Sequence, residues 1–234
     1  MGKYRELDTT RLLTFISLGS AGDAQNLIPP HDSYRYCDFL CINYYSKPDQ
    51  VEKSLLALHQ KYPEKPVFIS ETGLRADFVT NEQQRIDHLK EISGIIKRNP
   101  FVTGLSYWSF NDYLSRFTAT NPSGYREWGI VDAKRNPRGL YRAFQTELSP
   151  VLVTHEKGTL TVTAKADFPS YTLKNHKVIV RAGEKITAEH RLPVLNPGES
   201  FGIKMARPAA NMSIAIVNAL GFRIYDSEIN DLIK

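Results

Sequence analysis

The residues best suited to chemistry stand at the ends of short apolar runs. The run 66–70 leads directly into Glu71, and Gly73 follows two residues later. In parallel β/α folds, functional groups project from the C-terminal ends of the strands, so Glu71 stands where a catalytic carboxylate is expected. A glutamate that only solvates a strand end would produce the same pattern. This motif alone leaves both interpretations open.

A second group of candidate residues follows Val102, where an apolar run ends in aromatic and amide side chains. Trp108 and Asn111 are its main candidates. An aromatic ring at the mouth of a strand suits the apolar face of a sugar ring, and an amide suits the sugar hydroxyls. Core packing is the alternative, and it is the better interpretation for Tyr107 and Phe110. For Trp108 the pattern favours a pocket.

A third group is Asn43-Tyr44-Tyr45, again at a strand end. A phenol there can donate a hydrogen bond to a carboxylate, although a buried tyrosine that bonds to the backbone would look identical in sequence. The six histidines show no spacing typical of metal ligands. A Ser-His-Asp arrangement and a phosphate-binding glycine loop are also lacking, so the sequence predicts neither a metal nor a cofactor.

These groups need elements that place them at one edge of a sheet. Short apolar runs alternate with amphipathic stretches from Arg11 to Gly139, which is typical of β/α units around a parallel sheet. The runs predict four buried strands, at residues 12–17, 36–43, 66–70 and 102–108. Asp49 is expected to cap a first helix and Thr80 a second, and a last helix fits residues 137–148.

The pattern changes after Leu148. Residues 159–163, 178–180 and 212–217 alternate or run as short strands between glycines, which predicts an antiparallel β domain. An immunoglobulin-like sandwich is the expected form. The sequence therefore predicts two domains, an α/β domain over 1–148 and an all-β domain over 151–234.

Composition places the chain among ordinary globular proteins: it has 234 residues, 41% hydrophobic and 24% charged, with a net charge of +5. No basic patch for nucleic acid and no apolar run long enough for a membrane span is visible. Cys37 and Cys41 are expected to be reduced, buried thiols. The compartment stays open, because an export signal could lie in a segment outside this sequence.

Taken together, the segments resemble glycoside hydrolase family 2, the β-galactosidase, β-glucuronidase and β-mannosidase group. The resemblance rests on the order of five motifs. These are ELDTTRLLTF from Glu6, CINYY from Cys41, ISETG from Ile69, YWSFND from Tyr107, and EWGIVD from Glu127 with PRGLY from Pro137. The first four look like the entry to strand five, strand six, strand seven and strand eight of the family's TIM barrel.

The resemblance implies that the chain holds the second half of a (β/α)8 barrel, strands five to eight, followed by the sandwich. It also implies that Glu71 attacks the anomeric carbon, that Tyr44 orients it, and that Trp108 forms the floor of the sugar site. Asn111, Arg126 and Trp128 are the further expected sugar-binding residues. The partner acid of the family, an Asn-Glu pair after strand four, does not precede Glu6 in this sequence, so the chain by itself is expected to be inactive.

One departure from the family narrows the substrate. Members acting on glucuronides carry an Asn-x-Lys pair before the glycine that corresponds to Gly129, where it binds the sugar carboxylate. Here those positions read Arg126-Glu127-Trp128. Arg126 can still reach a carboxylate, but Glu127 and Trp128 suit a neutral sugar. A neutral β-hexoside, a β-galactoside first, is therefore the expected substrate.

The competing interpretation is a non-catalytic carbohydrate-binding or assembly fragment. The expected partners are a carbohydrate and either the missing barrel half or a second copy of the chain, without nucleic acid or membrane. Self-association is favoured because strands 12–17 and 102–108 would otherwise leave unpaired edges. The inner face of the sheet is expected to expose Phe15, Phe68, Ile69 and Leu105.

Overall fold

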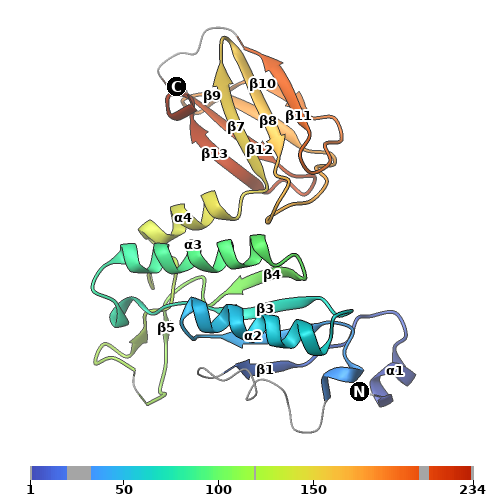
Figure 1. Ribbon diagram of the computed structural model, residues 1–234. Coiled ribbons are helices and arrows are strands. Elements are labelled where there is room, and N and C mark those ends of the chain that lie inside the picture. The colour runs from blue at the N-terminus through green and yellow to red at the C-terminus, as the bar shows by residue number, and fades with distance from the viewer. Residues whose placement is uncertain (1, 20–32, 119, 206–210, 233–234) are drawn as a thin grey trace. The chain divides into compact units, whose positions relative to one another are not determined.

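A computed structural model describes residues 2–19, 33–118, 120–205 and 211–232. The chain forms two compact units, Met1–Ala143 and Phe144–Lys234, coloured blue to yellow-green and yellow to red in Figure 1. The first unit is α/β and the second is all-β. Within the described residues, no helix is long and apolar enough to cross a membrane.

The first unit is built on a parallel sheet in the order β1-β2-β3-β4. Its strands are β1 (Ile16–Gly19), β2 (Leu40–Tyr44), β3 (Val67–Thr72) and β4 (Val102–Tyr107). Helix α2 (Pro48–Lys61) connects β2 to β3, and α3 (Glu82–Arg98) connects β3 to β4, as Figure 1 shows. Short elements complete the unit: α1 (Gly2–Leu7), η2 (Ser33–Tyr36), η3 (Ala76–Phe78), β5 (Tyr113–Leu114), β6 (Tyr125–Arg126) and the start of α4 (Gly139–Glu147).

The core of this unit lies against one face of the sheet. Alternate strand residues, Leu40 and Ile42 on β2 and Val67 and Ile69 on β3, are completely buried. The apolar stripes of the two helices are buried as well; they consist of Val51, Leu55, Leu58, Leu89, Ile92 and Ile96. The expected exposure of Ile69 on the open face is therefore wrong, because Ile69 belongs to the covered side.

Two expected strands begin later than the sequence pattern suggested. Leu13 donates its amide to the Asp38 carboxylate at 2.6 Å, and the Thr14 hydroxyl donates to the Phe39 carbonyl at 2.7 Å. These contacts hold residues 13 and 14 outside a strand ladder, so β1 begins at Ile16. A 3₁₀ turn occupies Ser33–Tyr36, and β2 begins only at Leu40.

The helix caps differ from the expected ones. Lys47 occupies the N-cap of α2 without a side-chain bond, and Pro48 starts the helix, so Asp49 lies inside the first turn. Asn81, instead of Thr80, caps α3 by accepting the amide of Gln84. Both cysteines are buried thiols outside any disulfide, as predicted.

The second unit is a β-sandwich of two antiparallel sheets. One has the order β11-β8-β7 and the other β10-β9-β12-β13. The strands are β7 (Val151–Glu156), β8 (Thr159–Ala164), β9 (Lys177–Ala182), β10 (Lys185–Arg191), β11 (Ser200–Lys204), β12 (Met212–Val217) and β13 (Arg223–Glu228), followed by η4 (Ile229–Leu232). Alternate residues of the facing strands share one core, for example Leu160 and Val162 against Val178 and Ile214.

Candidate functional site

Three parallel strands bring their C-terminal ends to one edge of the sheet. Tyr45 follows β2, Glu71 lies near the end of β3, and Trp108 follows β4. The Trp108 amide donates to the Thr72 carbonyl at 2.8 Å, which ties the end of β4 to the end of β3. This edge is where β/α proteins place their functional groups.

A β-bulge at Ser70 decides which way Glu71 points. On β3 the register passes from Ile69, paired with Ile42, directly to Glu71, paired with Asn43. Because strand residues alternate between faces, Glu71 would share the covered face of Ile69 in a regular strand. The extra residue reverses this alternation, and Thr72 occupies the covered face with 1% exposure. Glu71 is thereby turned towards the half-buried face that carries Ser70.

Glu71 is held by one phenol. Tyr45 donates its hydroxyl to Oε2 of Glu71 at 2.6 Å. Burial, and then the hydrogen bond to Glu71, raise the pKa of Tyr45, so the phenol stays protonated and remains a donor. Oε1 of Glu71 has no hydrogen-bond partner within the described part of the chain. One carboxylate oxygen is therefore anchored and the other is left for a ligand.

Tyr45 makes the contact with Glu71 that was expected of Tyr44. Tyr44 is only 1% exposed, and its hydroxyl has no hydrogen-bond partner among the described residues. Burial and then the nearby Tyr34 raise its pKa. Adjacent residues at a strand end point to opposite faces, so Tyr44 enters the covered core while Tyr45 reaches Glu71. The prediction that Tyr44 contacts the carboxylate is wrong.

Aromatic rings stand around the Tyr45–Glu71 pair. The Trp128 ring meets the Tyr45 ring edge-on, with 5.2 Å between centroids. The Arg126 guanidinium lies 6.0 Å from the centroid of the Trp128 ring and 5.8 Å from that of Phe117. The Arg126 side chain makes no hydrogen bond or ion pair with a described residue. The site therefore combines a carboxylate, apolar rings and one uncommitted cation.

Trp108 belongs to the same neighbourhood through Tyr113. Its ring is 37% exposed, and its indole N–H donates to the Tyr113 hydroxyl at 3.1 Å. Tyr113 lies opposite Arg126 in the β5–β6 ladder. Tyr45 belonged to the third group of candidate residues, but the contact with Glu71 was expected of Tyr44, and Tyr113 was not expected at the site. The pattern after Trp108 gave no sign that the chain returns as a two-stranded hairpin.

Asn111 lies in the loop that follows β4. Its side-chain amide donates to the Asp112 carbonyl at 2.7 Å, and its backbone bridges to Val131. The neighbouring Asp112 is 5% exposed and accepts two hydrogen bonds from Arg138, at 2.8 and 2.7 Å. This segment therefore closes the loop after β4 and leaves the Asn111 amide nitrogen engaged.

Two glycines allow the close approaches that shape the site. A Cβ on Gly73 would lie 2.3 Å from the Trp108 carbonyl oxygen, and one on Gly129 would lie 2.1 Å from that of Val131. Because both oxygens belong to the backbone, neither can move aside without a shift of the chain around it. The glycine two residues after Glu71 is therefore required for packing the end of β3 against Trp108.

A completely buried arginine, Arg85, bonds both to the segment after Glu71 and to the segment that carries Trp128. Arg85, in the first turn of α3, is 0% exposed. Its Nε donates to the Leu74 carbonyl at 2.8 Å, and one terminal nitrogen donates to the carbonyls of Trp128 and Gly129, both at 2.9 Å. Glu82 balances the charge at 3.2 Å. Arg85 thus links the segment after the candidate nucleophile to the segment that carries Trp128.

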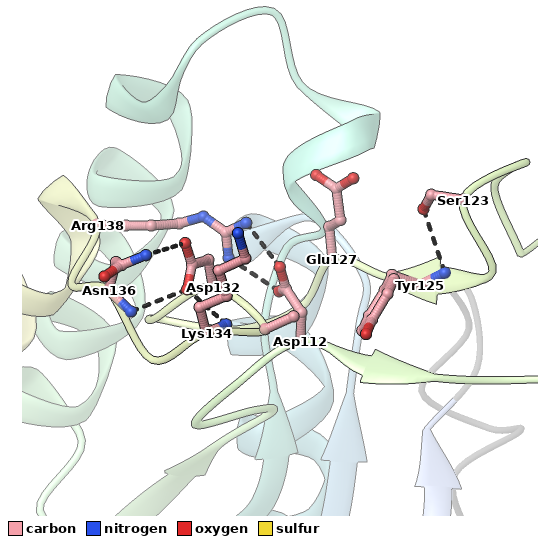
Figure 2. Close-up of a pocket in the computed structure, with 9 residues that line it drawn as sticks. Asp112, Ser123, Tyr125, Glu127, Asp132, Lys134, Asn136 and Arg138 are labelled. Atoms are coloured by element: carbon pink, nitrogen blue, oxygen red, sulfur yellow. Dashed lines mark hydrogen bonds and ion pairs between the residues drawn. The ribbon is translucent and has the colours of Figure 1, made fainter.

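A separate cavity of about 340 Å³ lies beside these residues, lined by Asp112, Ser123, Tyr125, Glu127, Asp132, Ala133, Lys134, Asn136 and Arg138. Figure 2 shows that its charged groups are largely paired, with Arg138 on Asp112 and with Asn136 and the Lys134 amide on Asp132. Glu127 lines this cavity and accepts from Asn121 at 3.0 Å. Within the described segments, no group of three or more acidic, histidine or cysteine side chains is arranged to hold a metal ion.

The comparisons with known proteins connect this fold to one class of enzymes. No protein-family model matches the sequence, and no curated protein matches it. Among solved structures, the Bacteroides uniformis β-glucuronidase matches over 95% of this chain with a TM-score of 0.53 and 16% identity. An FMN-binding β-glucuronidase from Faecalibacterium prausnitzii L2-6 matches over 95% with a TM-score of 0.51 and 14% identity.

These likenesses show the fold alone. The chain has a fold like part of these bacterial β-glucuronidases. It spans 28% of the length of the first of these chains and 35% of the second.

Proposed function

We propose that this chain is part of a retaining β-glycosidase and that Glu71 is its nucleophile. The observation that carries the proposal is the Tyr45–Glu71 hydrogen bond, which leaves Oε1 without a partner among the described residues and points it away from the covered core. Aromatic rings beside it, Trp108 and Trp128, suit the apolar face of a sugar. The β-glucuronidase-like fold agrees with this chemistry.

In this proposal Glu71 attacks the anomeric carbon and forms a glycosyl ester, while the bond to the leaving group breaks. Tyr45 keeps the carboxylate in the attacking orientation. A second carboxyl group, about 5 to 5.5 Å away, gives a proton to the leaving oxygen and later removes one from the water that hydrolyses the ester. We propose that strands β1 to β4 are strands five to eight of a TIM barrel and that the second unit is immunoglobulin-like.

The second carboxyl group is proposed to come from another polypeptide segment. In the described residues β1 pairs only with β2 and β4 only with β3, so both outer strands can accept a neighbour. The preceding half of a barrel would supply the acid and pair with these strands, whereas a second copy of the chain would pair with the strands only. We call the chain together with the segment that supplies the acid the complete enzyme.

Two sugar classes are candidates, and the residues favour them differently. A neutral β-hexoside, with a β-galactoside first, remains the proposal from Trp128 and from the missing Asn-x-Lys pair. A β-glucuronide is the second candidate, because Arg126 is an uncommitted cation next to Trp128 whereas Glu127 lines the separate cavity. Turnover of matched aryl galactosides and glucuronides separates the two.

Covalent trapping tests the function directly. A 2-fluoro aryl glycoside of the preferred sugar should label the complete enzyme once, and peptide mapping should place the label on Glu71. Reversible binding of the sugar without a label would instead favour a non-catalytic carbohydrate-binding fragment. A label on a different carboxylate would reject Glu71 as the nucleophile.

The two adjacent tyrosines should respond in opposite ways to loss of the hydroxyl. In the complete enzyme, Tyr45→Phe should lower turnover about 10- to 100-fold, because a hydrogen bond to a charged group is lost. Tyr44→Phe should keep turnover within about threefold and leave the free energy of unfolding unchanged or raised by up to about 1 kcal/mol, since it removes a buried hydroxyl without a described partner. Steady-state kinetics and denaturant unfolding measure both, and equal effects of the two variants would contradict the assignment.

The 234-residue chain assayed by itself should hydrolyse no aryl β-glycoside at a rate useful to a cell. Proton donation to the leaving group typically contributes about 10² to 10⁴-fold, and the proposed donor belongs to another segment. The assay needs a Glu71→Gln preparation as a control for contaminating host enzyme. Turnover by the chain that disappears in this control would show that the chain contains both carboxyl groups.

A further inference from the structure

Tyr113 is a phenol of the site neighbourhood whose hydrogen has no acceptor. Its oxygen accepts the Trp108 indole N–H at 3.1 Å, and the two rings meet edge-on with 5.9 Å between centroids. An indole N–H can only donate, so this contact uses a lone pair of Tyr113 and leaves the O–H proton available. No described residue accepts that proton.

The surroundings of Tyr113 place this free donor near Tyr45, the residue that bonds Glu71. Tyr113 is directly opposite Arg126 in the β5–β6 ladder, so both side chains lie on the same face of the hairpin. Arg126 neighbours Trp128, which packs on Tyr45, the residue that holds Glu71. Tyr113 also lies close enough to Tyr45 to contribute, after burial and Glu71, to the raised pKa of Tyr45.

We propose that Tyr113 is a specificity-determining residue whose O–H, aimed by the Trp108 indole, donates a hydrogen bond to an oxygen of the bound glycoside. The proposal rests on the proposed glycosidase function. It assigns Trp108 a second task, because its indole fixes the direction of the phenol as well as offering a ring to the sugar. The acceptor is a sugar hydroxyl in a neutral hexoside or a carboxylate oxygen in a uronide.

The first half of the proposal can be tested without substrate. Trp108 and Trp128 are the two tryptophans of the chain, so a ¹⁵N–¹H correlation spectrum contains two indole signals, which Trp108→Phe assigns. Tyr113→Phe should shift the Trp108 indole signal and leave that of Trp128 in place. A Trp108 signal that does not move would overturn the anchoring contact.

The second half is tested in the complete enzyme with aryl galactosides, glucuronides and their monodeoxy analogues. Tyr113→Phe should lower kcat/KM about tenfold for the preferred glycoside, and the loss should disappear for the analogue that lacks the contacted oxygen. Tyr125→Phe is the matched control, because Tyr125 is on the same hairpin but lines the separate cavity (Figure 2). Its kcat/KM should stay within about twofold.

An equal loss for every substrate, or no loss beyond about twofold, would overturn the proposal for Tyr113. Glu71→Gln, measured in parallel, distinguishes a failure of the role proposed for Tyr113 from a failure of the proposed glycosidase function. If Glu71→Gln is inactive and Tyr113→Phe is normal, only the role of Tyr113 fails. If Glu71→Gln retains turnover, the glycosidase assignment of Glu71 fails, and the proposal for Tyr113 fails with it.

Discussion

Glu71→Gln is expected to lower turnover of the complete enzyme by at least about a thousandfold while leaving the fold intact. A neutral amide cannot form the glycosyl ester, and loss of a nucleophile typically costs orders of magnitude in kcat. The amide oxygen of Gln can still accept the Tyr45 hydroxyl, so the hydrogen bond that is 2.6 Å long in the parent chain has a substitute. Steady-state kinetics with the preferred aryl glycoside measure the effect.

The matched control for this variant is Glu91→Gln, on the exposed side of α3. It makes the same change of charge away from the site and should leave turnover within about twofold. Both variants should keep the free energy of unfolding within about 1 kcal/mol of the parent value. Turnover of Glu71→Gln within tenfold of the parent would remove Glu71 from the mechanism.

The sequence predicted the strand that carries Glu71 but not the reason for the direction of its side chain. The apolar run ending at Ser70 indicated a buried strand, and β3 extends two residues further, to Thr72. The bulge at Ser70 appears only in the register with the neighbouring strands, because an extra residue leaves no mark on the hydrophobic pattern. A hydrophobic pattern therefore reveals a strand, whereas the face towards which the last side chains of the strand point depends on how the strand pairs with its neighbours.

The dependence of side-chain direction on strand pairing also explains why Tyr45, and not Tyr44, contacts Glu71. Both residues are tyrosines at the end of an apolar run, and neither composition nor spacing separates them. The choice depends on which position shares the face of Ile42, and Tyr44 does, because it is completely covered. Tyr113 could not be predicted because its contact with Trp108 needs the β5–β6 hairpin, whose strands have only two residues each.

Buried charge was equally hidden from the sequence. Arg85 stands four residues before Leu89, on the buried stripe of α3, but a charged residue within a polar stretch gives no sign of burial by its type. Its burial follows from three backbone carbonyls, of which that of Leu74 has Arg85 as its donor, while those of Trp128 and Gly129 accept from Arg85 and also from the Ser109 amide and from Arg138. Unpaired backbone oxygens in a core must find a donor, and the five N–H groups of a guanidinium supply several at once.

Arg85→Met is therefore expected to lower the free energy of unfolding of the first unit by about 3 kcal/mol or more. The substitution keeps much of the side-chain volume but removes the donor of the Leu74 carbonyl, one of the two donors of the Trp128 and Gly129 carbonyls, and the counter-ion of Glu82. Denaturant unfolding followed by tryptophan fluorescence measures this unit alone, because both tryptophans, Trp108 and Trp128, belong to it.

Arg98→Met, at the other end of α3, is the matched control for this prediction. Arg98 pairs with Glu52 through two bonds of 2.7 Å, but its side chain is 58% exposed. Exposed ion pairs contribute little, so this variant should cost no more than about 1 kcal/mol. A loss in Arg85→Met as small as that of the control would show that the carbonyls reach water or another donor when the guanidinium is removed. Arg85 would then not be the link between the segment after Glu71 and the segment that carries Trp128.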